Sequence, residues 1–225
     1  MDEYLSELER LEMAKKWWRE NYKSILLGAV IAVVVVGGWR YWQYRVESRS
    51  EAAAAMFADM LASMQKHDDT ASLTASKKII DEYSDTAYAA QAALAAAQVQ
   101  VTAGKFVDGQ KLLQWAIDHS NDAGLQMLAR LRLGRVQLAG GDAKAALATL
   151  DVPDAGAFAP LFDSVRGDAE VKLDDPTAAR AAYQKALDAW TDELGDRSLV
   201  KMKLDSLPAA ATSAPAAATH KTGKP

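Results

Sequence analysis

Residues 176–186 read PTAARAAYQKA, and this stretch decides the fold. Ala179, Tyr183 and Ala186 follow one another at intervals of four and three residues, which places them on one face of a helix. Small side chains on that face let a second helix approach closely, and the larger Tyr183 can fill the gap to the next pair of helices. The stretch therefore predicts one helix of an antiparallel helix pair.

Upstream of this stretch the same pattern recurs in a degraded form. We align Ala179 with three earlier small residues, Ala75, Gly109 and Ala146, which gives spacings of 34, 37 and 33 residues. Gly104 and Gly141 suit the tight turn inside a pair, because left-handed backbone angles cost glycine least. Since the tetratricopeptide period is about 34 residues, the spacing predicts a tetratricopeptide-like α-solenoid. An alanine-rich helical bundle without solenoid order is the alternative.

Composition supports an all-α protein. Of 225 residues, 45 are alanine, the best helix former, and β-branched residues are concentrated in a single segment. The formal net charge of -4 argues against a nucleic-acid-binding protein, which would present a basic face to phosphates. With no cysteine, the chain has no disulfide framework, thiol nucleophile or cysteine zinc site.

Residues 25–39 form an uncharged, mostly apolar run, and aromatic and basic residues flank it on both sides. Tyr, Trp, Lys and Arg favour the membrane interface, so we expect a single transmembrane helix over residues 22–42. The competing interpretations are a buried core helix and a cleaved signal peptide. The bulky, basic sequence GWRYW at residues 38–42 does not suit a signal cleavage site.

The basic residues also indicate an orientation. Five lie on the amino-terminal side of the uncharged run and three lie soon after it: Arg10, Lys15, Lys16, Arg19 and Lys23, against Arg40, Arg45 and Arg49. The positive-inside rule then predicts a cytoplasmic segment at residues 1–21 and a periplasmic repeat domain at residues 43–206. Leu5, Leu8 and Leu11 suggest that the first segment is an amphipathic helix. Residues 207–225 are rich in Ala, Pro and Thr and predict a disordered tail.

Three motifs resemble a known family: WWREN at residues 17–21, GWRYW at residues 38–42 and LRLGRVQ at residues 131–137. With the order of span and repeats, the chain is similar to the YfgM-like family of ancillary subunits of the bacterial Sec translocon. The tail from Pro208 onwards departs from the family pattern. The resemblance implies an inner-membrane protein that associates with Sec translocon subunits and with a membrane-anchored, parvulin-like periplasmic chaperone. It also implies a role in helping unfolded exported proteins, and no catalytic residues.

The residues themselves predict no enzyme. The three histidines, His67, His119 and His220, lack a second histidine at ligand spacing, so we expect no metal site. No phosphate-binding loop, dinucleotide fingerprint or nucleophile elbow is present, so we expect no cofactor and no catalytic residue. Asp142 and Asp175 suit the first position of a helix, where an aspartate caps backbone N–H groups.

Partner-binding candidates come from the first helix of each pair, which lines the concave face of such solenoids. They are Met60, Met64, Gln98, Leu131 and Arg135, with Leu94 and Leu138 beside them. Methionines adapt to varied partners, but ordinary core packing is the alternative for Met60 and Met64. Arg135 is the strongest surface candidate, because an unpaired arginine is rarely buried.

Inside the span, small residues mark a candidate face for packing against another membrane helix. They are Gly28, Ala32, Gly37 and Gly38. The alternative is ordinary span composition, since glycine is common in membrane helices. Two functional hypotheses follow: an ancillary Sec translocon subunit, and a membrane-tethered scaffold or regulator of another envelope complex.

Overall fold

The computed structural model describes residues 7–191, 194 and 197–208. Every regular element in these residues is helical, which confirms the predicted all-α class. The elements are α1 (Glu7–Gln65), α2 (Asp69–Glu82), α3 (Ala87–Thr102), α4 (Phe106–His119), α5 (Ala123–Ala139), α6 (Ala143–Leu150), the 3-10 turn η1 (Gly156–Phe158), α7 (Ala159–Lys172), α8 (Pro176–Asp188) and α9 (Ser198–Asp205).

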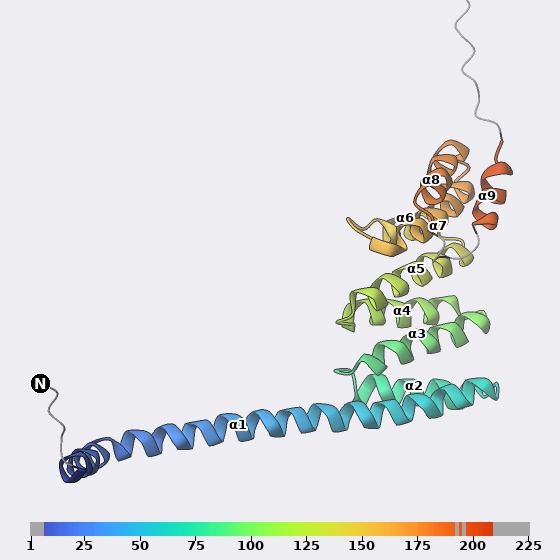
Figure 1. Ribbon diagram of the computed structural model, residues 1–225. Helices are drawn as coiled ribbons and strands as arrows, with labels where there is room; N and C mark the ends of the chain where they lie inside the picture. Colours follow the sequence, from blue (N-terminus) through green and yellow to red (C-terminus); the bar gives the residue numbers. More distant parts are fainter. Residues whose placement is uncertain (1–6, 192–193, 195–196, 209–225) are drawn as a thin grey trace, which may run out of the picture. The chain divides into compact units, whose positions relative to one another are not determined.

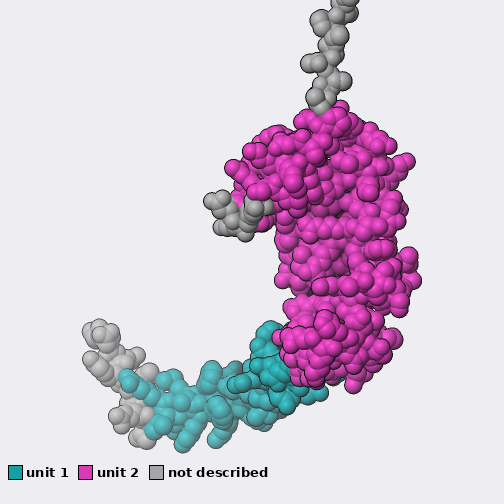
Figure 2. All heavy atoms as spheres, turned by 90° about the vertical axis from the view of Figure 1, so that its right-hand side faces the viewer, with its two compact units in different colours: residues 1–52 teal, residues 53–225 magenta. Residues whose placement is uncertain are grey.

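The chain divides into two compact units, residues 1–52 and residues 53–225 (Figure 2). Helix α1 contributes to both units without interruption, so neither end of the expected span at residues 22–42 coincides with a helix end. Within the part of the chain whose side chains are described, the first buried one is Ala53. By burial the repeat domain therefore begins ten residues after the expected boundary at residue 43.

The first unit contains the apolar run. From residue 9 to residue 52 nearly every described side chain is exposed, including the valines at positions 33–36. By length and composition, α1 is the one described helix that could cross a membrane. The beginning of the expected amphipathic segment, residues 1–6, lies outside the described residues.

In the second unit, consecutive helices pack against one another from α2 to α9 (Figure 1). Alternate helices also touch, α3 with α5 and α5 with α7. Met60 from the end of α1 packs with Ile79 of α2 and Ala89, Ala92 and Ala96 of α3. The last residues of α1 thus act as the first helix of the first pair, followed by the pairs α3–α4, α5–α6 and α7–α8. This arrangement is the expected solenoid.

Four residues with positive φ mark the turns inside the four pairs. They are His67 (56°), Gly104 (75°), Gly141 (90°) and Asp174 (59°). Their spacings are 37, 37 and 33 residues. The turns expected at Gly104 and Gly141 are confirmed. His67 and Asp174 adopt the same conformation at the equivalent turns of the first and fourth pairs. Neither residue type predicts a positive φ.

The turns also correct the alignment of the first pair. The second helices begin after Asp68, Lys105, Asp142 and Asp175, and the residue four positions later is buried each time: Ser72, Gly109, Ala146 and Ala179. Ala75 is only partly buried, so its assignment to this position was wrong. The physical reason is helix phase, because the side chain of Asp68 accepts a hydrogen bond from the Ala71 N–H and fixes where α2 begins.

Small residues bring the two helices of a pair together. A methyl group added at Gly134 of α5 would lie 3.1 Å from the side chain of Leu150 on α6. At Gly167 of α7 it would lie 2.4 Å from the ring of Tyr183 on α8. Gly134 and Gly167 thus lie at close approaches between the two helices of their pairs.

The carboxyl-terminal helices close the stack. Ala179, Tyr183 and Ala186 of α8 form a buried cluster with Val200 of α9, and Leu207 packs against it. Leu207 was assigned to the tail but belongs to this cluster. Its apolar side chain is partly buried against the residues of α8 and α9. The remainder of the expected tail, from residue 209, lies outside the described residues.

Candidate partner-binding surface

A groove lies between the first helices of two successive pairs, α3 and α5. Its volume is 280 Å³. It is lined by Leu94, Ala97, Gln98, Val101 and Thr102 of α3, Leu113 of α4, and Arg132, Arg135 and Val136 of α5. Two of the candidates selected from the sequence, Gln98 and Arg135, thus lie at one site, and both side chains are exposed.

The repeat explains why these two residues meet. Gln98 follows Ala97, Arg135 follows Gly134, and both small residues are buried at the contact between the helices of their own pair. The next position on a helix points about 100° away from that contact. Gln98 and Arg135, 37 residues apart, are therefore equivalent residues on the same face of neighbouring helices.

The floor of the groove is apolar. Leu94, Ala97, Leu113 and Val136 belong to one buried core cluster, and Val101 packs against it. Alanine at position 97 leaves space that a larger residue would fill. The groove therefore exposes apolar surface to whatever enters it.

The rim of the groove is cationic. Arg132 and Arg135 are three residues apart on α5, so their side chains lie on one helix face. In the described part of the chain, no hydrogen bond or ion pair is formed by either guanidinium. Burial lowers the pKa of Arg135, the charge of Asp168 opposes this shift, and the positive charge of Arg132 adds to it. The two arginines therefore repel one another beside apolar surface.

Asp168 of α7 occupies the position in the next helix pair that is equivalent to Gln98 and Arg135. It follows Gly167 as Arg135 follows Gly134, at a spacing of 33 residues. Its carboxylate accepts hydrogen bonds from the Tyr183 hydroxyl at 2.7 Å and from Lys203 Nζ at 2.7 and 2.8 Å. These bonds engage Asp168 with α8 and α9. Asp168 was not among the residues predicted from the sequence, although its spacing from residues 98 and 135 marks it.

Two candidates are not on this surface. Met60 is 0% exposed and Leu131 is 2% exposed, so their predicted surface position is wrong. Met60 occupies the position of Ala97 and Gly134 in the first pair, where the helix faces its neighbours. Leu131 packs with Leu150, Phe162 and Val165. Leu94 is also buried, although it lines the groove, while Met64 and Leu138 are partly buried.

The small residues of the expected span do not share one face. A methyl group added at Gly28, Gly37 or Gly38 would meet nothing within 4 Å. Because α1 is helical throughout this region, Gly37 lies about 180° around the helix axis from Gly28. Gly28 and Ala32 remain a neighbouring pair, and the expectation that Gly37 extends their face is wrong.

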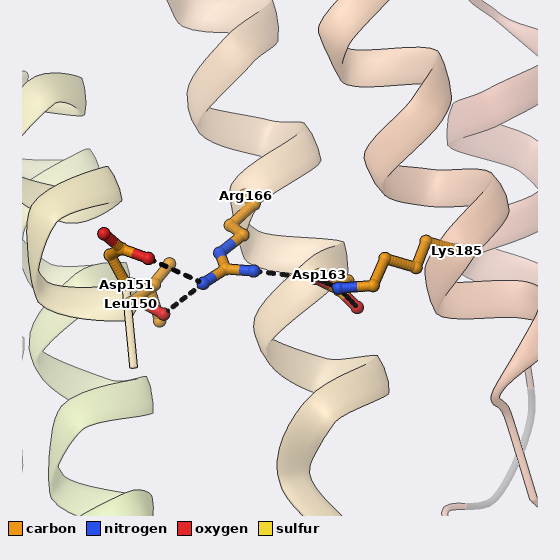
Figure 3. A network of polar contacts seen from close by, with 5 residues as sticks. All are labelled: Leu150, Asp151, Asp163, Arg166 and Lys185. Atoms are coloured by element: carbon orange, nitrogen blue, oxygen red, sulfur yellow. Dashed lines mark hydrogen bonds and ion pairs between the residues drawn. The ribbon is translucent and has the colours of Figure 1, made fainter. Parts of the chain in front are cut away.

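A polar network around the buried Asp163 links the last pairs (Figure 3). The carboxylate of Asp163, a residue 3% exposed, lies 3.1 Å from Arg166 Nη1 and 3.2 Å from Lys185 Nζ. Arg166 also donates a 2.6 Å hydrogen bond to the carbonyl of Leu150, the last residue of α6. The network joins α6, α7 and α8, and each member has a structural partner.

The histidines have structural surroundings as well. His67 occupies a turn, and the ring of His119 stacks on Trp115 at 4.3 Å between centroids. Within the described residues, no cluster of three His, Cys, Asp or Glu side chains could hold a metal ion. The groove between α3 and α5 is therefore the candidate site considered below.

The fold and the groove define a protein of the tetratricopeptide-repeat class. The family model described as a tetratricopeptide repeat-like domain matches residues 15–209. Among curated proteins, the chain is 31% identical to the ancillary SecYEG translocon subunit of Neisseria gonorrhoeae, over 92% of this chain and 100% of that protein. It is 30% identical to the protein of the same name from Escherichia coli, over 92% and 99%, and 29% identical to that from Haemophilus influenzae, over 90% and 98%.

The chain belongs to the family of ancillary SecYEG translocon subunits. The family resemblance seen in its sequence motifs is thereby confirmed.

Proposed function

We propose that this protein is a non-catalytic, single-span subunit that associates with the Sec translocon and assists newly exported proteins. The observation that carries the proposal is the family relationship, which extends over nearly the full length of relatives named as ancillary SecYEG translocon subunits. The structure supports it with an apolar, fully exposed segment in α1 and with a groove suited to binding another protein.

In this proposal residues 1–21 are cytoplasmic and the repeat domain is periplasmic in the bacterial inner membrane. The excess of basic residues before the apolar run supports this orientation. Because the chain has no cysteine, single cysteines can report it without background. In intact spheroplasts, a membrane-impermeant maleimide should label Lys144→Cys directly and Lys16→Cys only after permeabilisation. The reverse pattern would overturn the orientation.

The proposed partners are Sec translocon subunits, a membrane-anchored parvulin-like chaperone and unfolded exported chains. Photocrosslinking residues placed at Gln98 and Arg135 test the groove, and one at Ala32 tests the membrane segment. Lys111, exposed on the second helix of its pair, is the matched control position. We expect the groove positions to crosslink to a chaperone or an exported chain, Ala32 to a channel subunit, and Lys111 to neither.

Affinity purification of the full chain from native membranes provides the independent test. Recovery of channel subunits would support the proposal. Recovery of another envelope complex without channel subunits would refute it and favour a membrane-tethered scaffold or regulator.

A further inference from the structure

The groove between α3 and α5 contains a charge that the described residues leave uncompensated. Arg132 and Arg135 border it, and its remaining lining residues are apolar or neutral. Asp168 is the carboxylate whose charge acts on Arg135, but Lys203 and Tyr183 already bind it at 2.7 Å. A guanidinium beside apolar walls loses hydrogen bonds to water. A carboxylate can replace them, because it accepts two parallel hydrogen bonds from the guanidinium.

The floor of the groove limits what the rest of the ligand can be. Leu94, Ala97, Val101, Leu113 and Val136 offer apolar contacts in a volume of 280 Å³. This volume lies close to the lower bound of about 300 Å³ for ligand pockets and has room for one large apolar side chain. A free inorganic anion would leave the apolar floor uncovered, whereas an extended peptide can cover the floor and reach the rim together.

We infer that this groove binds an extended segment of a partner protein in which a carboxylate lies next to a large apolar side chain. Arg132 and Arg135 hold the carboxylate, and the apolar side chain lies on the floor between the two helices. The neutral Gln98 and Thr102 stand on the opposite wall, where an amide and a hydroxyl can bond to the peptide backbone. This inference rests on the proposed function, because it names the kind of segment that the repeat domain receives.

The test uses the full chain in phosphatidylcholine nanodiscs, whose lipid carries no net charge. The probe is a short fluorescein-labelled peptide, acetylated and amidated, with a central Glu-Leu-Phe. Its comparison peptides carry Gln-Leu-Phe and Glu-Ala-Ala at the same place. Fluorescence anisotropy gives the dissociation constants. We expect each comparison peptide to bind about tenfold more weakly or worse, since a charge-assisted hydrogen bond and a buried apolar side chain each contribute at least that factor.

Variants then assign the effect to the groove. In Arg132→Gln and Arg135→Gln, the preference for the Glu peptide over the Gln peptide should fall at least severalfold. In Lys144→Gln, which removes an exposed charge from α6, it should stay unchanged. Circular dichroism of each variant establishes that it is folded. Equal affinities for the Glu and Gln peptides, absence of saturable binding, or a preference that survives both arginine substitutions would overturn the inference.

Comparing the peptide measurements with the affinity purification from native membranes separates this inference from the proposed function. If channel subunits co-purify with the wild-type chain but the peptides bind without discrimination, only the inference fails. If the peptides discriminate but channel subunits do not co-purify, only the proposed translocon association fails.

Discussion

Replacing Gly167 by alanine should destabilise the repeat domain even though alanine is the better helix former. The added methyl group would lie 2.4, 2.5 and 2.8 Å from Cε1, Cδ1 and Cζ of the Tyr183 ring. Tyr183 is 2% exposed, and its hydroxyl is held by Asp168 at 2.7 Å. The ring therefore cannot move aside without losing packing and a hydrogen bond.

Three contributions set the expected size of the effect. Alanine in place of glycine inside a helix gains about 1 kcal/mol. Overpacking of a filled core costs about 1–3 kcal/mol, and contacts this short belong at the upper end. Disturbing the hydrogen bond of Tyr183 costs about 1 kcal/mol more. The free energy of unfolding should therefore fall by about 2–3 kcal/mol.

Urea unfolding of the full chain in detergent, followed by far-ultraviolet circular dichroism, measures this change. A double-mutant cycle with Tyr183→Leu identifies its cause, because Gly134 faces Leu150 at the equivalent contact one pair earlier. We expect Gly167→Ala to cost much less in the Tyr183→Leu background. If Gly167→Ala is as stable as the wild type, or if the two substitutions are additive, the steric explanation is refuted.

Three further predictions concern the turn at Gly141, the polar network around Asp163 and the pH dependence of unfolding. Gly141→Ala should cost about 1–2 kcal/mol in the urea assay because its φ is 90° and no atom crowds the added methyl group, whereas a similar loss in the right-handed neighbour Gly140→Ala would contradict this. Asp163→Asn should cost about 2 kcal/mol because it removes the buried carboxylate between Arg166 and Lys185, and Arg166 keeps only the exposed Asp151 at 3.8 Å. The exposed Asp81→Asn should cost less than about 0.5 kcal/mol, and equal losses would argue against the network. Burial, with the hydrogen bond to Asp168, raises the pKa of Tyr183 above its ordinary 10.0, so unfolding should become easier as pH rises above about 10, where only the unfolded chain ionises. Tyr183→Phe should flatten this dependence in urea titrations at several pH values, and an unchanged slope would refute the assignment.

The sequence predicts the turns of this fold well where glycine occupies them. The turns at Gly104 and Gly141 could be predicted because a positive φ is costly for residues other than glycine. His67 and Asp174 adopt the same angles, and nothing in their residue types marks a turn. The phase of α2 was misjudged for the same reason, since the turn at His67 and not the nominal repeat length decides that Ser72 is buried.

Alanine-rich helices also hide which face is buried. In α3 most residues are apolar on every side, so a hydrophobic pattern cannot separate the groove from the core. Gln98 and Arg135 were identified because polar residues interrupt that pattern. Met60 and Leu131 were misplaced because apolar side chains suit either environment. The Asp168–Lys203 ion pair joins residues 35 positions apart and depends on how α9 packs, which no local pattern reveals.

The small residue at the start of each second helix limits how this protein can change. Ser72, Gly109, Ala146 and Ala179 occupy equivalent places, and the three residue types share little except volume. The fold therefore requires a small side chain at each of these places, and the limit is tightest at Gly109, where an added methyl group would lie 2.6 Å from the side chain of Val101. Because a repeat contacts only the repeats beside it, a change at one of these positions disturbs its own pair and the neighbouring repeats and leaves the more distant pairs unaffected. Sequence change can therefore accumulate repeat by repeat, and the chain is only 29–31% identical to three relatives that it matches over 90–92% of its length.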